Sequence, residues 1–159
     1  MNVGFFRHGI AAARGTPGVA EADRPLTPEG RKKTARAAKG VKKLDLGFDA
    51  IYTSPLPRAM QTAEILTKEL RLGKPKVLDA LLPGTPGRRL LQDVRRLPEK
   101  SPLLVGHEPQ LSATVSLAVC GAAQGSFELK KAGLAFVELE KSSATLKLLL
   151  TSAALRALA

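Results

Sequence analysis

The chain has 159 residues, of which 44% are apolar and only 4% aromatic, with no tryptophan. This length can bury one sizeable core but is too short for two comfortable domains, so we expect a single domain over residues 1–159. The formal net charge of +11, from 25 Lys and Arg against 14 Asp and Glu, favours anionic partners, such as phosphate esters, phosphoproteins, nucleic acid or an anionic surface.

The same composition excludes or disfavours several classes of protein. Cys120 is the single cysteine, so an intramolecular disulfide is excluded. A helix needs about eighteen apolar residues to span a bilayer, and no apolar run of the sequence is that long. Met1 leads within one residue into an expected strand, without the features of a secretory signal, so we expect a cytoplasmic protein with no membrane partner. The few aromatic residues do not interleave with basic ones, which argues against nucleic-acid binding.

The first elements along the chain are a strand and a helix separated by a long connection. The apolar run at 2–6, NVGFF, has the length of a strand. The irregular stretch at 9–25 is longer than a simple connection requires, which is typical of functional loops. A helix is expected over 26–44, with Thr27 as its N-cap and Pro28 at its first position.

This helix is basic and contains a glycine. Gly40 is a position at which the helix could end early. Seven of the 25 Lys and Arg lie in 31–43, which we interpret as a solvated helix face. On the helix they mostly point away from the apolar positions Ala35, Ala38, Val41 and Leu44.

The remaining sequence continues to alternate between strands and helices. We expect a strand at 48–54, a helix at 54–72 capped by Ser54, a short strand within 76–83, a helix at 87–97, a strand at 101–107 and a helix at 109–121. Apolar runs at 133–140 and 144–150 predict an antiparallel hairpin. The pattern predicts an α/β fold, a three-layer α/β/α sandwich around a mostly parallel sheet with this hairpin at its C-terminal end. The apolar tail at 151–159 either packs on the core as a helix or contributes to a dimer; a monomer is the default expectation.

Distinctive polar residues follow three of the expected strands. They are Arg7, His8 and Gly9 after the first strand, the SPLPR segment at 54–58, and Gly106, His107 and Glu108. Ligands of such sheets bind beyond the carboxyl ends of parallel strands, so these segments should converge at one edge. The two histidines of the chain, His8 and His107, would then face each other beside Arg7 and Arg58.

These residue types fit phosphoryl chemistry. A neutral imidazole has an unprotonated nitrogen that can attack phosphorus, and its usual pKa near 6.5 leaves it largely neutral at neutral pH. Arginine is always charged, and its fork of donors can bind phosphoryl oxygens and stabilise their charge in the transition state. The sequence therefore predicts a phosphate site that contains a nucleophile.

Four motifs resemble the histidine phosphatase superfamily, whose fold is phosphoglycerate mutase-like. They are RHG at 7–9, RPLTPEG at 24–30, SPLPRAMQTAEIL at 54–66 and VGHEPQLS at 105–112. The short length is similar to that of the SixA-type phosphohistidine phosphatases. The resemblance implies that His8 is a transiently phosphorylated nucleophile, that Arg7 and Arg58 clamp the phosphoryl group, and that His107 donates a hydrogen bond to it.

The resemblance also implies partners and cofactors. No metal or other cofactor is expected, and the sequence has no HExxH motif and no paired Cys or His at ligand spacing. The favoured substrate is phosphohistidine on a protein, since the chain has no insertion long enough to enclose a small metabolite. Two alternatives are a small phosphate ester as substrate and an inactive module that only binds phosphate or a similar anion.

The general acid and the supporting residues are less defined by the sequence. Larger members of the family carry a glutamate after the third strand, where this chain has Asp79. Glu108 and Glu21, the latter with its neighbour Asp23, are further candidates for the acid, or no dedicated acid is needed. Gly9 is explained by a tight turn or by close approach to a ligand. Arg24 is expected either to shape the phosphate pocket or to hold the preceding loop.

Overall fold

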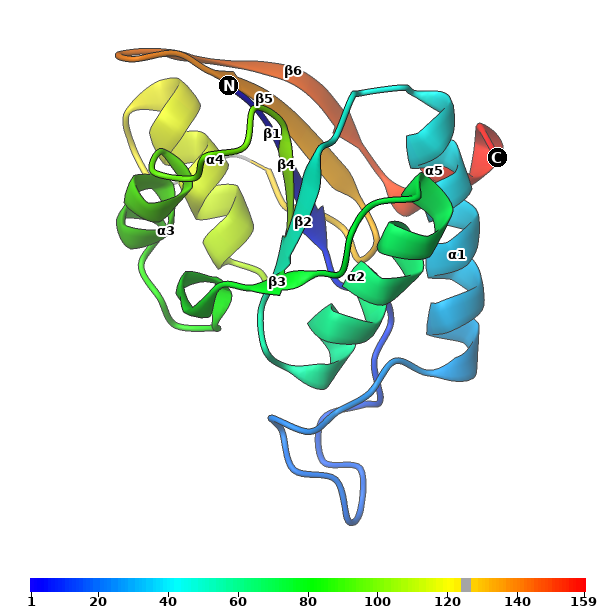
Figure 1. Ribbon diagram of the computed structural model, residues 1–159. Coiled ribbons are helices and arrows are strands. Elements are labelled where there is room, and N and C mark those ends of the chain that lie inside the picture. The colour runs from blue at the N-terminus through cyan, green and yellow to red at the C-terminus, as the bar shows by residue number, and fades with distance from the viewer. Residues whose placement is uncertain (124–126) are drawn as a thin grey trace.

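One mixed sheet forms the centre of the molecule (Figure 1). The structure, a computed structural model, describes residues 1–123 and 127–159. Over these residues the sheet has the order β3-β2-β4-β1-β5-β6, in which β1 to β4 are parallel and β5 and β6 are antiparallel to their neighbours β1 and β5. The strands are β1 (Asn2–Arg7), β2 (Ala50–Thr53), β3 (Lys76–Val77), β4 (Pro102–Gly106), β5 (Leu134–Leu139) and β6 (Ala144–Leu150).

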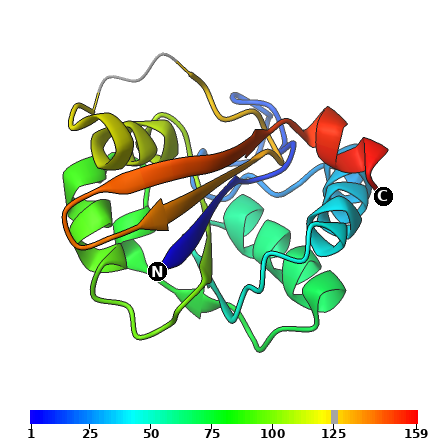
Figure 2. The ribbon, with the colours of Figure 1, turned by 90° about the horizontal axis from the view of Figure 1, so that it is seen from above.

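Helices cover both faces of this sheet, which confirms the predicted three-layer α/β/α fold (Figure 2). One face carries α1 (Pro28–Lys43), α2 (Pro57–Leu70) and α5 (Ser152–Ala157); the other carries α3 (Gly87–Val94), α4 (Gln110–Cys120) and the 3-10 turn η1 (Asp79–Leu81). The consecutive, fully buried residues Phe5 and Phe6 of β1 point to opposite faces and belong to the two separate cores. In the described part of the chain, no helix is long and apolar enough to cross a membrane.

The start of α1 agrees with the sequence, whereas the start of α2 does not. Thr27 caps α1, and its Oγ1 accepts a hydrogen bond of 2.9 Å from the backbone N–H of Gly30. The expected cap of α2, Ser54, lies outside that helix, which begins at Pro57 with Leu56 in the cap position. A residue that precedes proline is disfavoured in the helical conformation, so Leu56 stays extended and the helix starts later.

Gly40 does not end α1, which continues to Lys43. The lack of a side chain at Gly40 allows α5 to pack closely against α1. The C-terminal tail folds as α5 and packs on α1, with Leu155 fully buried, so the core-packing alternative for the tail is the one observed. A Cβ atom at Gly40 would lie 1.9 Å from the Leu155 carbonyl oxygen. Glycine at this position therefore reflects helix packing and not a break in the helix.

We expect Gly40→Ala to lower the free energy of unfolding by about 1–3 kcal/mol, because α5 must move to admit the new methyl group. Gly73→Ala is the control, since no atom lies within 4 Å of a Cβ built there. Urea denaturation of both variants and of the wild type measures the difference. Equal stability of the Gly40 and Gly73 variants would contradict this account of the packing.

Candidate active site

The carboxyl ends of the parallel strands bring the two histidines together. Arg7 of β1 is paired with Gly106 of β4, so His8 and His107 leave adjacent strands at the same level. The backbone N–H of His8 donates to the Gly106 carbonyl at 3.0 Å, and the two imidazole rings lie with centroids 5.0 Å apart and planes tilted by 57°. The segments that follow β1 and β4 therefore meet at one edge of the sheet, as predicted.

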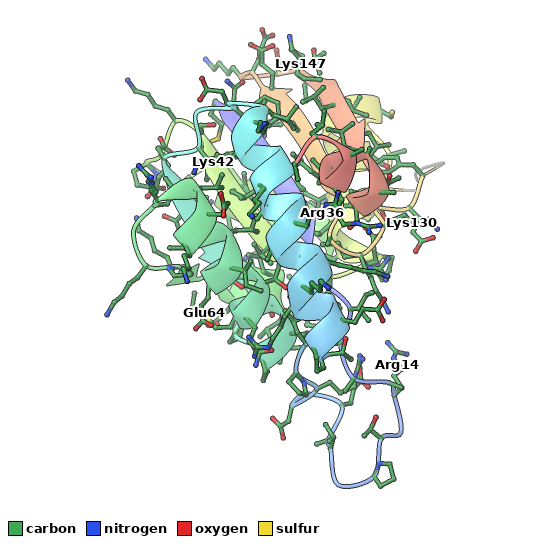
Figure 3. All side chains as sticks on the ribbon, turned by 90° about the vertical axis from the view of Figure 1, so that its right-hand side faces the viewer. Arg14, Arg36, Lys42, Glu64, Lys130 and Lys147 are labelled. Atoms are coloured by element: carbon green, nitrogen blue, oxygen red, sulfur yellow. The ribbon has the colours of Figure 1, made fainter. Side chains whose placement is uncertain are left out.

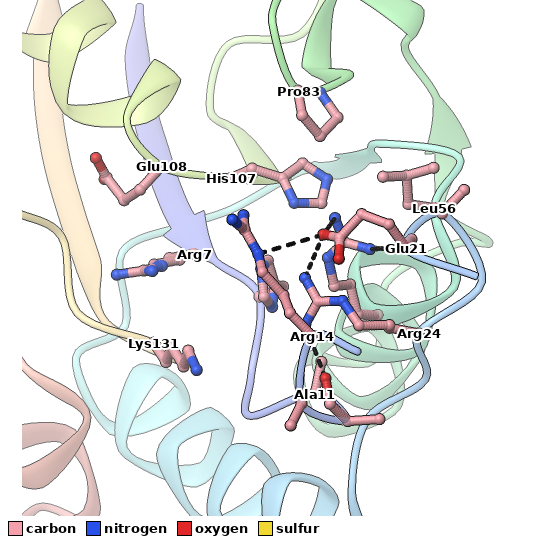
Figure 4. A pocket seen from close by; sticks show the side chains of 15 residues that line it. Arg7, Ala11, Arg14, Glu21, Arg24, Leu56, Pro83, His107, Glu108 and Lys131 are labelled. Carbon is pink, nitrogen blue, oxygen red and sulfur yellow. Dashed lines mark hydrogen bonds and ion pairs between the residues drawn. The ribbon is translucent and has the colours of Figure 1, made fainter. Parts of the chain in front are cut away.

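A pocket of about 730 Å³ opens beside these rings (Figure 4). It is formed by the ends of β1 and β4, the start of α2, and the long loop between β1 and α1. Among the residues singled out by the sequence, those that line it are Arg7, His8, Glu21, Arg24, Arg58, His107 and Glu108. Gly9, Asp23 and Asp79 are not among its lining residues.

His8 is held in one tautomer. Its Nδ1 lies 2.7 Å from the carbonyl oxygen of Gly9, which can only accept, so Nδ1 carries the proton and Nε2 carries the lone pair. Nε2 has no hydrogen-bond partner among the described residues. The side chain is only 7% exposed, and this burial, together with the charges of Arg58 and Arg7, lowers the pKa of His8 from 6.5 to about 3. His8 is thus neutral across the physiological pH range.

Gly9 connects His8 to the two helices α1 and α2. Its N–H donates to Thr62 Oγ1 of α2 at 3.0 Å, and the Thr62 hydroxyl in turn donates to the carbonyl of Arg58 at 2.7 Å. A Cβ atom at Gly9 would lie 2.2 Å from Thr34 Oγ1 of α1. Because Gly9 has no side chain, the turn after β1 fits between α1 and α2, and Gly9 supports this loop.

His107 is oriented by a residue that the sequence analysis assigned to a helix cap. Its Nε2 lies 3.0 Å from the hydroxyl oxygen of Ser54, at the end of β2. The ring is 3% exposed, and burial, followed by the neighbouring His8 and Arg58, lowers the pKa of His107 to about 3. Three adjacent parallel strands thus supply the two rings and the hydroxyl that holds one of them.

Arg58 and Arg24 are both buried and both contact the loop at 9–25. Arg58 Nη1 donates to the carbonyl of Glu21 at 3.1 Å. Arg24 Nη1 donates to the carbonyl of Ala12 at 2.8 Å, and its Nη2 donates to the Glu21 carboxylate at 2.6 Å. Arg24 therefore combines the two roles that the sequence left open, since it lines the pocket and also holds the loop.

Arg7 has a partner that the sequence did not suggest. Its Nη1 donates to Glu128 Oε1 and to the Leu129 carbonyl, each at 2.9 Å, and Glu128 also pairs with Lys130 at 2.8 Å. Three of the arginines that line the pocket have a buried Nε atom with no acceptor among the described residues; these are Arg7, Arg24 and Arg58. A bound oxyanion would supply such acceptors.

The candidate acids differ sharply in their surroundings. The hydrogen bond from Arg24 lowers the pKa of Glu21, so this carboxylate is ionised and ill suited to donate a proton. Asp79 is exposed in η1 and outside the pocket. Burial raises the pKa of Glu108, whose Oε2 accepts from the Ser112 hydroxyl and whose Oε1 is buried without a partner among the described residues. In the view of Figure 4, Glu108 and Glu21 lie on opposite sides of His107. Glu108 is the carboxyl group best suited to hold a proton.

Two cations that line the pocket were missed by the sequence analysis. Arg14 belongs to the loop at 9–25, whose length had marked it as functional, and its Nε lies 3.6 Å from the Glu21 carboxylate. Lys131 precedes β5 and carries no motif; only the pairing of β5 with β1 brings it to the site. No group of three or more His, Cys, Asp or Glu residues in the described ranges has the arrangement of a metal site.

Comparison with known proteins identifies one family. The model of the Histidine phosphatase superfamily (branch 1) matches residues 3–82. An uncharacterized protein of Picosynechococcus sp. is 40% identical over 137 residues, which cover 84% of this chain and 82% of that relative.

Two solved structures illustrate the similarity of the fold. The protein histidine phosphatase SixA complexed with tungstate has a TM-score of 0.84 and 25% identity, over 96% of this chain and 98% of that one. The alpha-ribazole phosphatase from Shigella flexneri has a TM-score of 0.73 and 18% identity, over 96% and 97% of the chains, and is similar in fold.

The buried neutral histidines predict a stability that falls with acid. Between pH 6.5 and about 3, each histidine is protonated in the unfolded chain and neutral in the folded one, so unfolding takes up protons and stability decreases as the pH falls. Each contributes a slope of about 1.4 kcal/mol per pH unit near pH 5. His107→Gln should reduce the slope by about this amount in urea denaturation between pH 6 and 4.5. An unchanged slope would show that His107 titrates normally in the folded state.

Proposed function

The chain belongs to the histidine phosphatase superfamily and is a phosphatase, and we propose that it removes the phosphoryl group from phosphohistidine on a protein through a phosphorylated His8. The observation that carries this proposal is the His8 ring, with Nδ1–H bound to the Gly9 carbonyl and the lone pair on Nε2, in a pocket lined by arginines. The likeness to the SixA protein histidine phosphatase supports the choice of substrate.

In the first step of this mechanism the phosphoryl oxygens accept hydrogen bonds from Arg7 and Arg58, and also from Arg24, in place of the Glu21 groups that Arg58 and Arg24 contact in the structure. The lone pair of His8 Nε2 attacks phosphorus. The bond between phosphorus and the substrate nitrogen breaks, and its electron pair stays on the departing imidazole, which is protonated. His107, neutral and held by Ser54, donates a hydrogen bond to the phosphoryl group.

In the second step water attacks the phosphorus of phospho-His8. The new oxygen–phosphorus bond forms as the phosphorus–nitrogen bond breaks, the electron pair returns to Nε2, and inorganic phosphate leaves. Glu108 is the group proposed to pass protons, giving one to the departing group in the first step and taking one from water in the second. Imidazole is a better leaving group than an alkoxide, so the need for this acid depends on the substrate.

The shape of the pocket supports a macromolecular substrate. It is shared between the sheet edge and the loop at 9–25, and no additional domain covers it in the described ranges. A phosphorylated side chain on a protein surface can reach such a site without being enclosed, whereas recognition of a small metabolite relies on burial of most of its surface.

Replacement of His8 tests the mechanism. We expect His8→Ala to lose at least about 1,000-fold in kcat on both a phosphohistidine protein and p-nitrophenyl phosphate, because the variant lacks the imidazole whose Nε2 lone pair is proposed to attack phosphorus. The wild type, quenched with base during turnover, should carry an acid-labile phosphoryl group at His8 that is detectable by mass spectrometry. Tungstate binding by His8→Ala, measured by calorimetry, is the control for an intact pocket.

Survival of both activities in this variant would reject the nucleophile. If the wild type hydrolyses p-nitrophenyl phosphate and small phosphate esters but not phosphohistidine protein, the proposed substrate is wrong although the mechanism stands.

Glu108 can be tested through the leaving group. Glu108→Gln should lower kcat about 10- to 100-fold for an alkyl ester such as phosphoserine, whose leaving group needs a proton, and much less for p-nitrophenyl phosphate. Asp79→Asn, outside the pocket, is the matched control and should leave both rates unchanged. An equal loss on the two substrates would mean that Glu108 acts in another way than as an acid.

A further inference from the structure

Two further hollows continue from the phosphoryl pocket over the surface. The first, of about 480 Å³, lies between α1, α5 and residues 128–132, and shares Arg7 and Lys131 with the phosphoryl pocket. The second, of about 520 Å³, lies along α1 and shares Lys33 and Arg156 with the first. The active site is therefore connected to the outer face of α1 by a continuous, uneven surface, which Figure 3 views from the α1 and α5 side.

This surface is strongly basic. We call six of the cations that line it the basic track; they are Lys131, Lys33, Arg156, Arg36, Lys32 and Lys39. Glu29 and Glu128 also line it, but Glu29 pairs with Lys33, and Glu128 pairs with Arg7 and Lys130. In the described ranges no carboxylate lies within 4 Å of any other cation of the track. The track therefore carries a large uncompensated positive charge.

The packing of α1 keeps these charges together on one side. The helix buries Thr34, Ala37, Ala38 and Val41 against the sheet, while Ala35 is only half-buried, contrary to the predicted apolar face. Lys32, Arg36 and Lys39 recur at spacings of four and three residues, which places them on one exposed stripe about 10 Å long. Like charges at this spacing destabilise a helix, so a merely solvated face would gain from alternating signs. An anionic partner would remove this repulsion.

We propose that the basic track docks an acidic surface of the phosphoprotein substrate and so orients its phosphohistidine toward His8. This inference rests on the proposed function. The track begins at the pocket that takes the phosphoryl group, so an acidic partner bound along it has its phosphorylated side chain beside His8. The residues that line the two hollows include no aromatic side chain, so they offer no platform on which the bases of a nucleic acid stack.

The test compares two phosphohistidine peptides that differ only in charge: one has four glutamates beside the phosphohistidine, and the other has glutamines. The triple variant Lys32→Gln, Arg36→Gln, Lys39→Gln removes three charges of the track. The matched control, Lys68→Gln, Lys74→Gln, Lys100→Gln, removes three exposed charges that form no ion pair in the structure and lie near the amino ends of β3 and β4 or at the end of α2. Both variants lower the net charge of +11 by the same amount.

The wild type should show a kcat/KM about tenfold higher for the acidic peptide than for the glutamine peptide in low salt, and most of this preference should disappear at about 0.5 M salt. The track variant should lose the preference, while its hydrolysis of p-nitrophenyl phosphate stays unchanged. The control variant should keep the preference. The proposal is overturned by an equal loss in the control variant, or by no preference in the wild type.

A separate binding experiment tests docking independently of the proposed substrate. If neither phosphohistidine peptide is hydrolysed, the substrate assignment fails, and docking is then read from binding of the unphosphorylated acidic peptide by fluorescence anisotropy. Weaker binding by the track variant than by the control variant supports the track; equal binding overturns it. Tighter binding of a DNA duplex than of the acidic peptide, lost in the track variant, would assign this face to nucleic acid and overturn the proposal.

Discussion

The peptide group of Gly9 is the constraint on which the geometry of the site depends. Its carbonyl accepts the Nδ1 proton of His8, which defines the tautomer, and its N–H donates to Thr62 of α2. A Cβ atom at this position would lie 2.2 Å from Thr34 Oγ1 of α1, so there is no space for a side chain. One residue therefore contacts both helices that follow β1 in the chain. The direction of the imidazole ring is a consequence of how the whole α1–α2 layer packs on the sheet.

Burial gives the two histidines their chemistry at a cost in stability under acid. The rings are less than a tenth exposed, and the same desolvation that lowers each pKa to about 3 prevents protonation from quenching the lone pair. The nearby arginines act in the same direction, because a cationic ring would be repelled by them. The charges that are proposed to bind a phosphoryl anion thus also help burial to keep the proposed nucleophile neutral.

The sequence predicted the features that depend on local pattern and topology. Alternating strands and helices gave the sheet, and the rule that parallel strands end at one edge brought His8, Arg58 and His107 together. Features that depend on packing between distant segments were not predictable. Gly40 looked like a helix break because its neighbour Leu155 is over a hundred residues away. Glu128 and Lys131 reach the site only because β5 pairs with β1, which no motif in their segment indicates.

The distribution of charge relates the pocket to the track that continues from it. The arginines that line the pocket already contact anions, since Glu21 contacts Arg24, and Glu128 contacts Arg7 from the neighbouring hollow. In the proposed mechanism an arriving phosphoryl group exchanges with Glu21 instead of filling an uncompensated site, so the net gain from binding phosphate alone is reduced and its release is favoured. The track has no such compensation over most of its length. In this proposal the basic track, which binds the acidic surface of the partner, is separate from the pocket in which the phosphoryl group reacts. The partner can therefore stay bound to the track while the product phosphate leaves the pocket.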